Sequence, residues 1–163
     1  MRRLIIGKRI PGHFLTGAAL FALSAALRYN SLAQTPFANG WDGYFYLVQL
    51  KSWVETGRMH SPEASLIYPY LRTFYWLTDD YVTALKLGAS ILAGLFTWTI
   101  YALAAGSDEK EQSLFPAVLL ASFSVFSPQL TYFAAQFPKN LLGVILFTAF
   151  AGSLSRLRDS GEP

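Results

Sequence analysis

The sequence predicts an all-α protein, an integral-membrane helical bundle of about four transmembrane helices, and three observations lead to this fold class. Of the 163 residues, 53% are hydrophobic and only 14% are charged, whereas about 25% of residues are charged in an ordinary soluble domain. The apolar residues gather in separate stretches instead of being spread along the chain. The segment between the first two stretches is rich in aromatic side chains, which is typical of helices at a membrane surface.

Composition also excludes several function classes. The chain contains no cysteine, which excludes disulfide frameworks, zinc ribbons and thiol catalysis. Its two histidines lack the His-x-x-x-His spacing of a metal cage, so no metal site is predicted. The net charge of +3 is small and dispersed, whereas nucleic-acid binding requires clustered Lys and Arg. We therefore expect no nucleic-acid partner.

The first two spans are expected at residues 13–28 and 82–105. A secretory signal peptide is the alternative for the first stretch, because basic residues precede it. However, Arg28-Tyr29-Asn30 follow at once and Ala33-Gln34-Thr35 is a poor cleavage site, which favours an uncleaved span. The second stretch is uncharged from Leu87 to Ala105, close to the ~20 residues that cross a bilayer.

The third and fourth spans are expected at residues 114–127 and 140–155. Pro128 divides the third apolar stretch, so an irregular or re-entrant piece should continue from there through Phe137. The fourth span ends before the basic tail at 156–163. The chain is thus expected to form a single transmembrane domain.

Basic residues near the span ends predict the orientation. The tail at 1–12 carries Arg2, Arg3, Lys8 and Arg9, and the tail at 156–163 carries Arg156 and Arg158. Basic residues near the ends of a span favour the cytoplasmic side, and an even number of spans places both termini on that same side. The acidic residues of the loop 107–113, which would also be cytoplasmic, have little influence on the orientation. Residues 30–81 would then form a long extracytoplasmic loop at the plasma (inner) membrane.

This loop is predicted to contain two amphipathic interfacial helices. Trp41, Tyr44, Phe45 and Val48 recur at helical spacing, and the helix should run from Trp41 to Thr56 with Gly57 as its C-cap. Ser61-Pro62-Glu63 is a turn or helix start. A second short helix, about Tyr70–Leu77, leads into the second span.

Asp42 stands at the start of the first interfacial helix. One interpretation is an N-cap, in which the carboxylate accepts hydrogen bonds from free helix N–H groups. The other is a general base at the membrane surface, among aromatic rings that could stack on sugar faces. The two roles are compatible.

These residues carry a resemblance to a known family. A basic tail, one span, the run Trp41-Asp42-Gly43-Tyr44-Phe45-Tyr46-Leu47, then Glu55-Thr56-Gly57-Arg58 and Ile67-Tyr68-Pro69, are similar to the N-terminal part of the C-fold (GT-C) membrane glycosyltransferases. These include the protein mannosyltransferases, the aminoarabinose transferases and the oligosaccharyltransferase catalytic subunits. The family has many more spans, so the chain is expected to be an incomplete module that further membrane helices of a longer chain or a partner subunit would complete.

The resemblance implies transfer of a sugar from a polyprenyl-phosphate-linked donor to a glycan, lipid or protein acceptor at the extracytoplasmic face. It implies that Asp42 is the essential acidic residue of the catalytic site and that Glu63 is a second carboxylate. Lys139 and Arg72 are candidates for the lipid phosphate, and Tyr44 or Tyr46, which face different sides of the helix, for the substrate. Membrane lipid is an expected partner, and a divalent cation is left open as a cofactor.

Each residue also has a structural interpretation. Glu63 is then a first-turn helix acid, Lys139 a snorkelling anchor and Arg72 a surface residue facing water or headgroups. Asp79-Asp80 is expected to cap the second span. The competing function is a non-catalytic accessory or scaffold subunit of the membrane, and a transporter fragment is a weaker third interpretation.

Overall fold

The regular secondary structure of the described residues is α-helical. The structure is a computed structural model that describes residues 12–105 and 114–160, without the side chains of 156–160. Arg2, Arg3, Lys8 and Arg9 and the acidic loop 107–113 therefore lie outside the described residues, and the side chains of Arg156 and Arg158 are not described. The helices in chain order are α1 (Gly12–Leu32), α2 (Trp41–Thr56), α3 (Ile67–Thr78), α4 (Tyr81–Ala104), α5 (Leu114–Phe126), α6 (Pro128–Gln136) and α7 (Pro138–Ser160).

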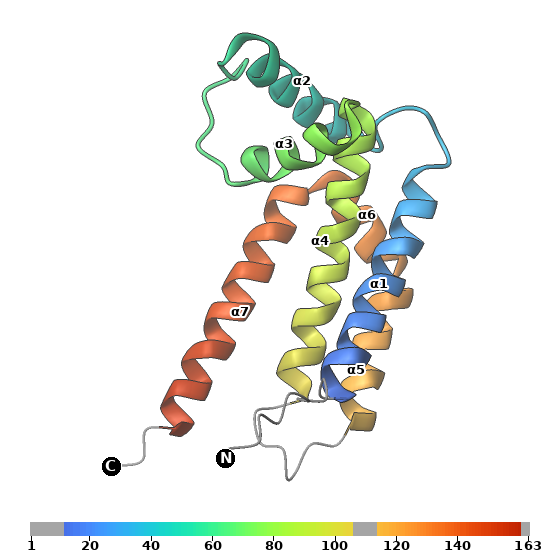
Figure 1. The fold of residues 1–163 in the computed structure, drawn as a ribbon, viewed down its shortest axis with the longest axis vertical. Helices are drawn as coiled ribbons and strands as arrows, with labels where there is room; N and C mark the ends of the chain where they lie inside the picture. Colours follow the sequence, from blue (N-terminus) through green and yellow to red (C-terminus); the bar gives the residue numbers. More distant parts are fainter. Residues whose placement is uncertain (1–11, 106–113, 161–163) are drawn as a thin grey trace, which may run out of the picture.

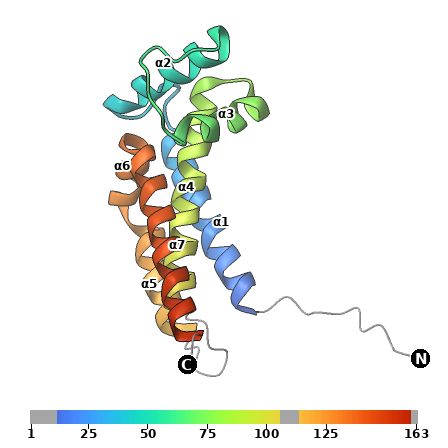
Figure 2. The same ribbon diagram turned by 90° about the vertical axis from the view of Figure 1, so that its left-hand side faces the viewer.

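Helices α1, α4, α5 and α7 stand side by side, and α2 and α3 lie across one end of them (Figure 1). Helices α1 and α5 run toward the end that holds α2 and α3, whereas α4 and α7 run away from it (Figure 1). A view turned by 90° shows α2 and α3 again gathered at this end (Figure 2). Helix α4 packs against each of the other helices. We call α2, α3 and the connecting residues 57–66 the cap layer.

Helix α4 is the clearest candidate for a membrane span. Among the described residues it alone is a single helix long and apolar enough to cross a bilayer, and the bent pair α5–α6 passes the same test if it is counted as one broken span. The all-helical fold class is therefore confirmed, but about four spans are not. One such helix is also compatible with the core of a soluble protein.

The break at Pro128 is confirmed; the piece after it is not irregular, whereas the alternative prediction of a re-entrant piece agrees with the bent pair α5–α6. Residues Pro128–Gln136 form a regular helix that is bent by 59° from α5. Ser127 supplies the N-cap, because its hydroxyl accepts from the Leu130 N–H. The N–H of the first helical residue has no partner within the helix, so proline, which lacks an N–H, fits this position. Pro128 therefore begins α6 at the same point where it ends α5.

Helix α1 extends past the predicted end at residue 28. Arg28 is 4% exposed, and its guanidinium donates to the carbonyl oxygens of Val125 and Ser124, both at 2.7 Å, and of Ser127 at 2.9 Å. The last turn of a helix leaves carbonyls without intrahelical partners. Arg28 satisfies those of α5 from the neighbouring helix, so it braces the α5–α6 bend instead of ending α1.

The cap layer has its own apolar core, which rests on α4. Five of its side chains are at most 5% exposed: Tyr46, Leu50, Ile67, Tyr68 and Leu71. The predicted bounds of α2 are confirmed, including Gly57, which has φ 74° and donates its N–H to Trp53 O. Helix α3 begins earlier than predicted, at Ile67.

Asp79 and Asp80 have separate roles. Asp80 caps α4 as predicted, since its carboxylate accepts from the Thr83 N–H at 2.6 Å. Asp79 instead ends α3, in the left-handed conformation with φ 52°. The two acids therefore make a sharp turn between the cap layer and the central helix.

Candidate functional site

Asp42 lies in the first turn of α2, but it is not the N-cap. The N-cap is Gly40, which has φ 77° and offers no side chain to the helix. The interpretation of Asp42 as the cap is therefore wrong. No described residue donates a hydrogen bond to its carboxylate, and the residue is partly exposed. Its backbone N–H instead donates to Gln136 Oε1 at 3.5 Å.

Glu63 lies in the irregular segment before α3, so its interpretation as a first-turn helix acid is also wrong. Both of its oxygens are engaged: Oε1 accepts from Lys139 Nζ at 2.6 Å, and Oε2 accepts from the Tyr68 hydroxyl at 2.6 Å. These hydrogen bonds, first that of Lys139 and then that of Tyr68, lower the pKa of Glu63. Glu63 is thus a rigidly held, ionised carboxylate.

Lys139 is the second residue of α7 and joins this helix to the cap layer. The hydrogen bond to Glu63 raises the pKa of Lys139, and the charge of Asp42 adds to the effect. Its side chain is 45% exposed, so the ammonium can be reached from water. The interpretation of Lys139 as a snorkelling anchor does not account for its hydrogen bond to Glu63.

Tyr46 lies between these charges. It is 5% exposed, and its burial is the main cause that raises its pKa. The charge of Lys139 and a hydrogen bond to its backbone lower the pKa of Tyr46, whereas the charges of Asp42 and Glu63 raise it further. The fold thus brings four of the six predicted residues together at one end of the bundle. With Tyr68 they form what we call the cap cluster: Asp42, Tyr46, Glu63, Tyr68 and Lys139.

Arg72 and Tyr44 lie outside the cap cluster. The Arg72 guanidinium stacks over the rings of Trp53, at 4.7 Å from the centroid, and Trp76, at 5.3 Å. Such cation–π contacts account for its position without a phosphate ligand. Tyr44 is 52% exposed and, as the helical spacing predicts, faces away from the buried Tyr46. Of the two tyrosines, only Tyr46 is in the cluster.

Two residues near the site carry no signal of their own in the sequence. Tyr68 lies within the Ile-Tyr-Pro run of the resemblance, but nothing there indicates that its hydroxyl donates to Glu63. Gln136 ends α6, where Pro138 stops the helix, and reaches the start of α2. Sequence reasoning misses both because the partners are brought together only by tertiary packing.

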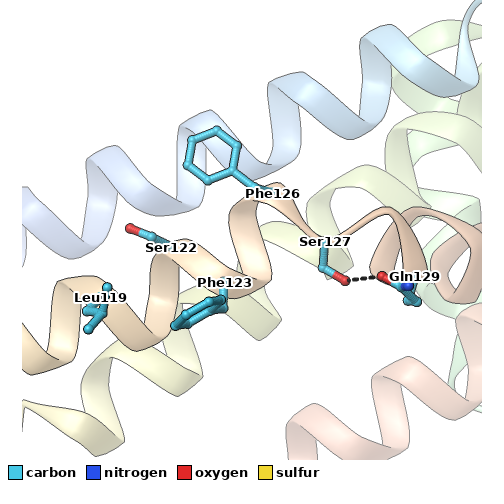
Figure 3. Close-up of a pocket in the computed structure, with 6 residues that line it drawn as sticks. All are labelled: Leu119, Ser122, Phe123, Phe126, Ser127 and Gln129. Atoms are coloured by element: carbon cyan, nitrogen blue, oxygen red, sulfur yellow. Dashed lines mark hydrogen bonds between the residues drawn. The ribbon is translucent and has the colours of Figure 1, made fainter.

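A cavity of about 550 Å³ lies elsewhere, against α5 and the start of α6. Figure 3 shows Leu119, Ser122, Phe123 and Phe126 along α5, with Ser127 and Gln129 at the bend, where the Ser127 hydroxyl donates to Gln129 Oε1 at 3.1 Å. None of the predicted site residues lines this cavity. It is therefore separate from the cap cluster.

Metal ligation finds little support in the side chains of the cap cluster. Within residues 12–105 and 114–155, no three His, Cys, Asp or Glu side chains gather in a way that could hold a metal ion. Glu63 already uses both oxygens within the protein. We therefore assign no residue to a divalent cation.

Comparison of the chain with protein-family models, with curated proteins and with solved structures finds no match. The candidate function consequently depends on the residues and geometry of the cap cluster.

Proposed function

We propose that the chain is the N-terminal part of a membrane glycosyltransferase that transfers a sugar from a polyprenyl-phosphate-linked donor at the extracytoplasmic face. The observation that carries the proposal is the cap cluster. Asp42, whose carboxylate accepts no hydrogen bond from the described residues, lies in the same cluster as the half-exposed ammonium of Lys139. These are the two charges that the reaction requires, a base for the acceptor and a cation for the leaving phosphate.

The transfer step assigns a role to each charge. The acceptor hydroxyl oxygen attacks the anomeric carbon, while the bond from that carbon to the phosphate oxygen breaks and its electron pair leaves with the phosphate. Asp42 takes the hydroxyl proton. Lys139 stabilises the negative charge on the departing lipid phosphate, and Glu63 holds the ammonium in position.

The membrane arrangement in this proposal has α1, α4, α5 and α7 as four spans. Two observations support it. The four helices alternate in direction, which returns both ends of the described bundle to the side opposite the cap layer (Figure 1). Large apolar side chains on their outer faces, such as Leu15, Phe115, Phe147 and Phe150, are between 55% and 74% exposed, as expected for contact with lipid.

One observation favours the accessory-subunit function. Both candidate phosphate-binding cations already have partners, since Lys139 contacts Glu63 and Arg72 stacks on Trp53 and Trp76. In a scaffold, such pairs would serve only to fix the cap layer. The two functions differ in whether the Asp42 carboxylate, which has no such partner in the described part of the chain, is required.

The test is the Asp42→Asn variant, assayed in membranes that contain the full-length gene product. The probes are radiolabelled polyprenyl-phosphate mannose, glucose and aminoarabinose, with membrane acceptors. Loss of a general base should slow transfer about 10²–10⁴-fold, whereas the shape of the side chain is retained. Asp80→Asn is the matched control, because Asp80 only caps α4 and should leave transfer unchanged. Transfer by Asp42→Asn at the wild-type rate would refute the assignment.

A further inference from the structure

The start of α2 lacks the side-chain cap that its position requires. Helix N-termini leave backbone N–H groups without partners, and a Ser, Thr, Asp or Asn at the N-cap normally accepts from the N–H of the second or third helical residue. Gly40 occupies the N-cap here and provides no acceptor. Asp42 is the second helical residue, so its own N–H is one of those that need a partner.

Gln136 provides that acceptor from another helix. Its Oε1 accepts from the Asp42 N–H at 3.5 Å, across 94 residues of sequence, and the side chain is only 9% exposed. The amide lies directly over Gly40, where a Cβ would overlap the amide nitrogen and carbon. Glycine at position 40 thus serves two purposes: it adopts the positive φ of the turn, and its missing side chain leaves space for the Gln136 amide.

Among residues 12–105 and 114–155, no group donates a hydrogen bond to the Asp42 carboxylate, which agrees with capping of α2 from Gln136. An Asp at the N-cap would use its carboxylate to bind the helix N–H groups. Because Gln136 accepts from the backbone instead, the Asp42 side chain is not consumed by capping. The residues after Gln136 lead directly to Lys139, so one short stretch, 136–139, contacts both the start of α2 and Glu63.

We propose that Gln136 is a positioning residue of the cap cluster: it caps α2 in place of a local side chain, and so holds the Asp42 carboxylate fixed and free for proton transfer. Gln136 does not touch the substrate. This inference rests on the proposed glycosyl transfer for its effect on rate, but the capping itself can be measured without any activity.

The first experiment measures amide hydrogen exchange of the first turn of α2 in the full chain, in nanodiscs. Gln136→Ala should speed exchange of the Asp42 amide about tenfold, because a hydrogen bond is lost. Gln136→Glu retains an acceptor oxygen at the same reach and should restore slow exchange. Gln129→Ala, a change of an exposed glutamine on the same helix, is the control and should have no effect. Unchanged exchange in Gln136→Ala would overturn the capping role.

The second experiment measures transfer from the same polyprenyl-phosphate sugar probes by the same variants. Gln136→Ala should lower kcat about tenfold with an unchanged KM for the donor, since the base is misplaced while donor contacts remain, and Gln136→Glu should recover kcat. Faster exchange with unaltered kcat would overturn the positioning role. A wild-type protein without transfer activity would overturn the proposed function, whereas the exchange result would still decide whether Gln136 caps α2.

Discussion

The four-helix bundle and the cap layer are held together by different chemistry. In the bundle, α1, α4 and α5 meet through small and hydroxyl-bearing residues: Gly94 of α4 lies against Phe21 of α1. The hydroxyls of Ser24 on α1, Thr97 on α4 and Ser124 on α5 form a chain of two hydrogen bonds, each of 2.9 Å. In the cap layer, α2 and α3 meet through the rings of Tyr46 and Tyr68, and the Glu63–Lys139 ion pair joins the layer to α7. The bundle should therefore be sensitive to added volume, and the cap layer to charge.

In the proposed membrane arrangement, this difference follows from the surroundings of each region. Lipid provides little hydrophobic driving force between helices, so a bundle in a membrane gains stability from close backbone approach and interhelical hydrogen bonds. A layer in contact with water gains stability by burying aromatic surface, and its ion pairs weaken as solvent reaches them. The comparison is thus a test of the proposed membrane arrangement.

The largest effect is expected for Arg28→Ala in the bundle. The change leaves the carbonyls of Ser124, Val125 and Ser127 without their donor, at a cost of about 3 kcal/mol or more in the free energy of unfolding. Denaturant titration of the detergent-solubilised protein measures the change. Arg58→Ala, an exposed arginine of the cap layer, is the control and should have little effect. Equal stability of the two variants would contradict the bracing role of Arg28.

An intermediate effect is expected for Gly94→Ala. The new methyl group would contact both the ring and the backbone carbonyl oxygen of Phe21. Such overpacking typically lowers the free energy of unfolding by about 1–3 kcal/mol. Gly143→Ala places the same methyl group in open space on α7 and should stabilise the protein by up to about 1 kcal/mol through helix propensity. The same titration measures both, and a stabilising Gly94→Ala would show that α1 and α4 do not approach so closely.

The smallest effect is expected for Glu63→Gln in the cap layer, at up to about 1 kcal/mol, because the ion pair is partly exposed. The pKa of Glu63 is lowered in the folded protein, so its contribution is fully present above the unfolded pKa and is lost as pH falls through the folded pKa. The stability difference between wild type and variant should thus shrink below pH 4.5. Denaturation measured from pH 7 to pH 3 checks this.

Glu55→Gln is the control for this measurement. Glu55 pairs with Lys51 at 3.9 Å and is 51% exposed, so its removal should change the free energy of unfolding less than Glu63→Gln. A difference for Glu63→Gln that grows as the pH falls would mean that the ion pair does not stabilise the cap layer.

Local patterns predict much of the fold. The apolar stripe and Gly57 predict α2 within its observed bounds, and Pro128 predicts the break after α5. Each signal lies within a few residues of the feature that it specifies. Pro128 alone does not decide between an irregular and a re-entrant piece after the break, because proline both ends a helix and fits the first position of a new one.

The candidate site depends on contacts that no local pattern encodes. Glu63 meets Lys139 across 76 residues of sequence, and Asp42 meets Gln136 across 94. The family resemblance implies Glu63 and Lys139 as site residues, one as a carboxylate and the other as a phosphate ligand, but it does not predict that they form a pair. The Gln136 contact and the Arg28 bracing of α5 arise from helix packing, and an arginine after an apolar stretch predicted only the end of a span.

The most direct test of the central claim is the side of the membrane on which the cap layer lies. The chain has no cysteine, so single-cysteine variants can be labelled without background. Lys51→Cys replaces a 60% exposed side chain of the cap layer, and Gly12→Cys lies in open space at the other end of the bundle. A membrane-impermeant maleimide should label Lys51→Cys in intact cells and Gly12→Cys only after permeabilisation. Labelling of Lys51→Cys only after permeabilisation would place the cap cluster in the cytoplasm and contradict transfer from a lipid-linked donor at the outer face.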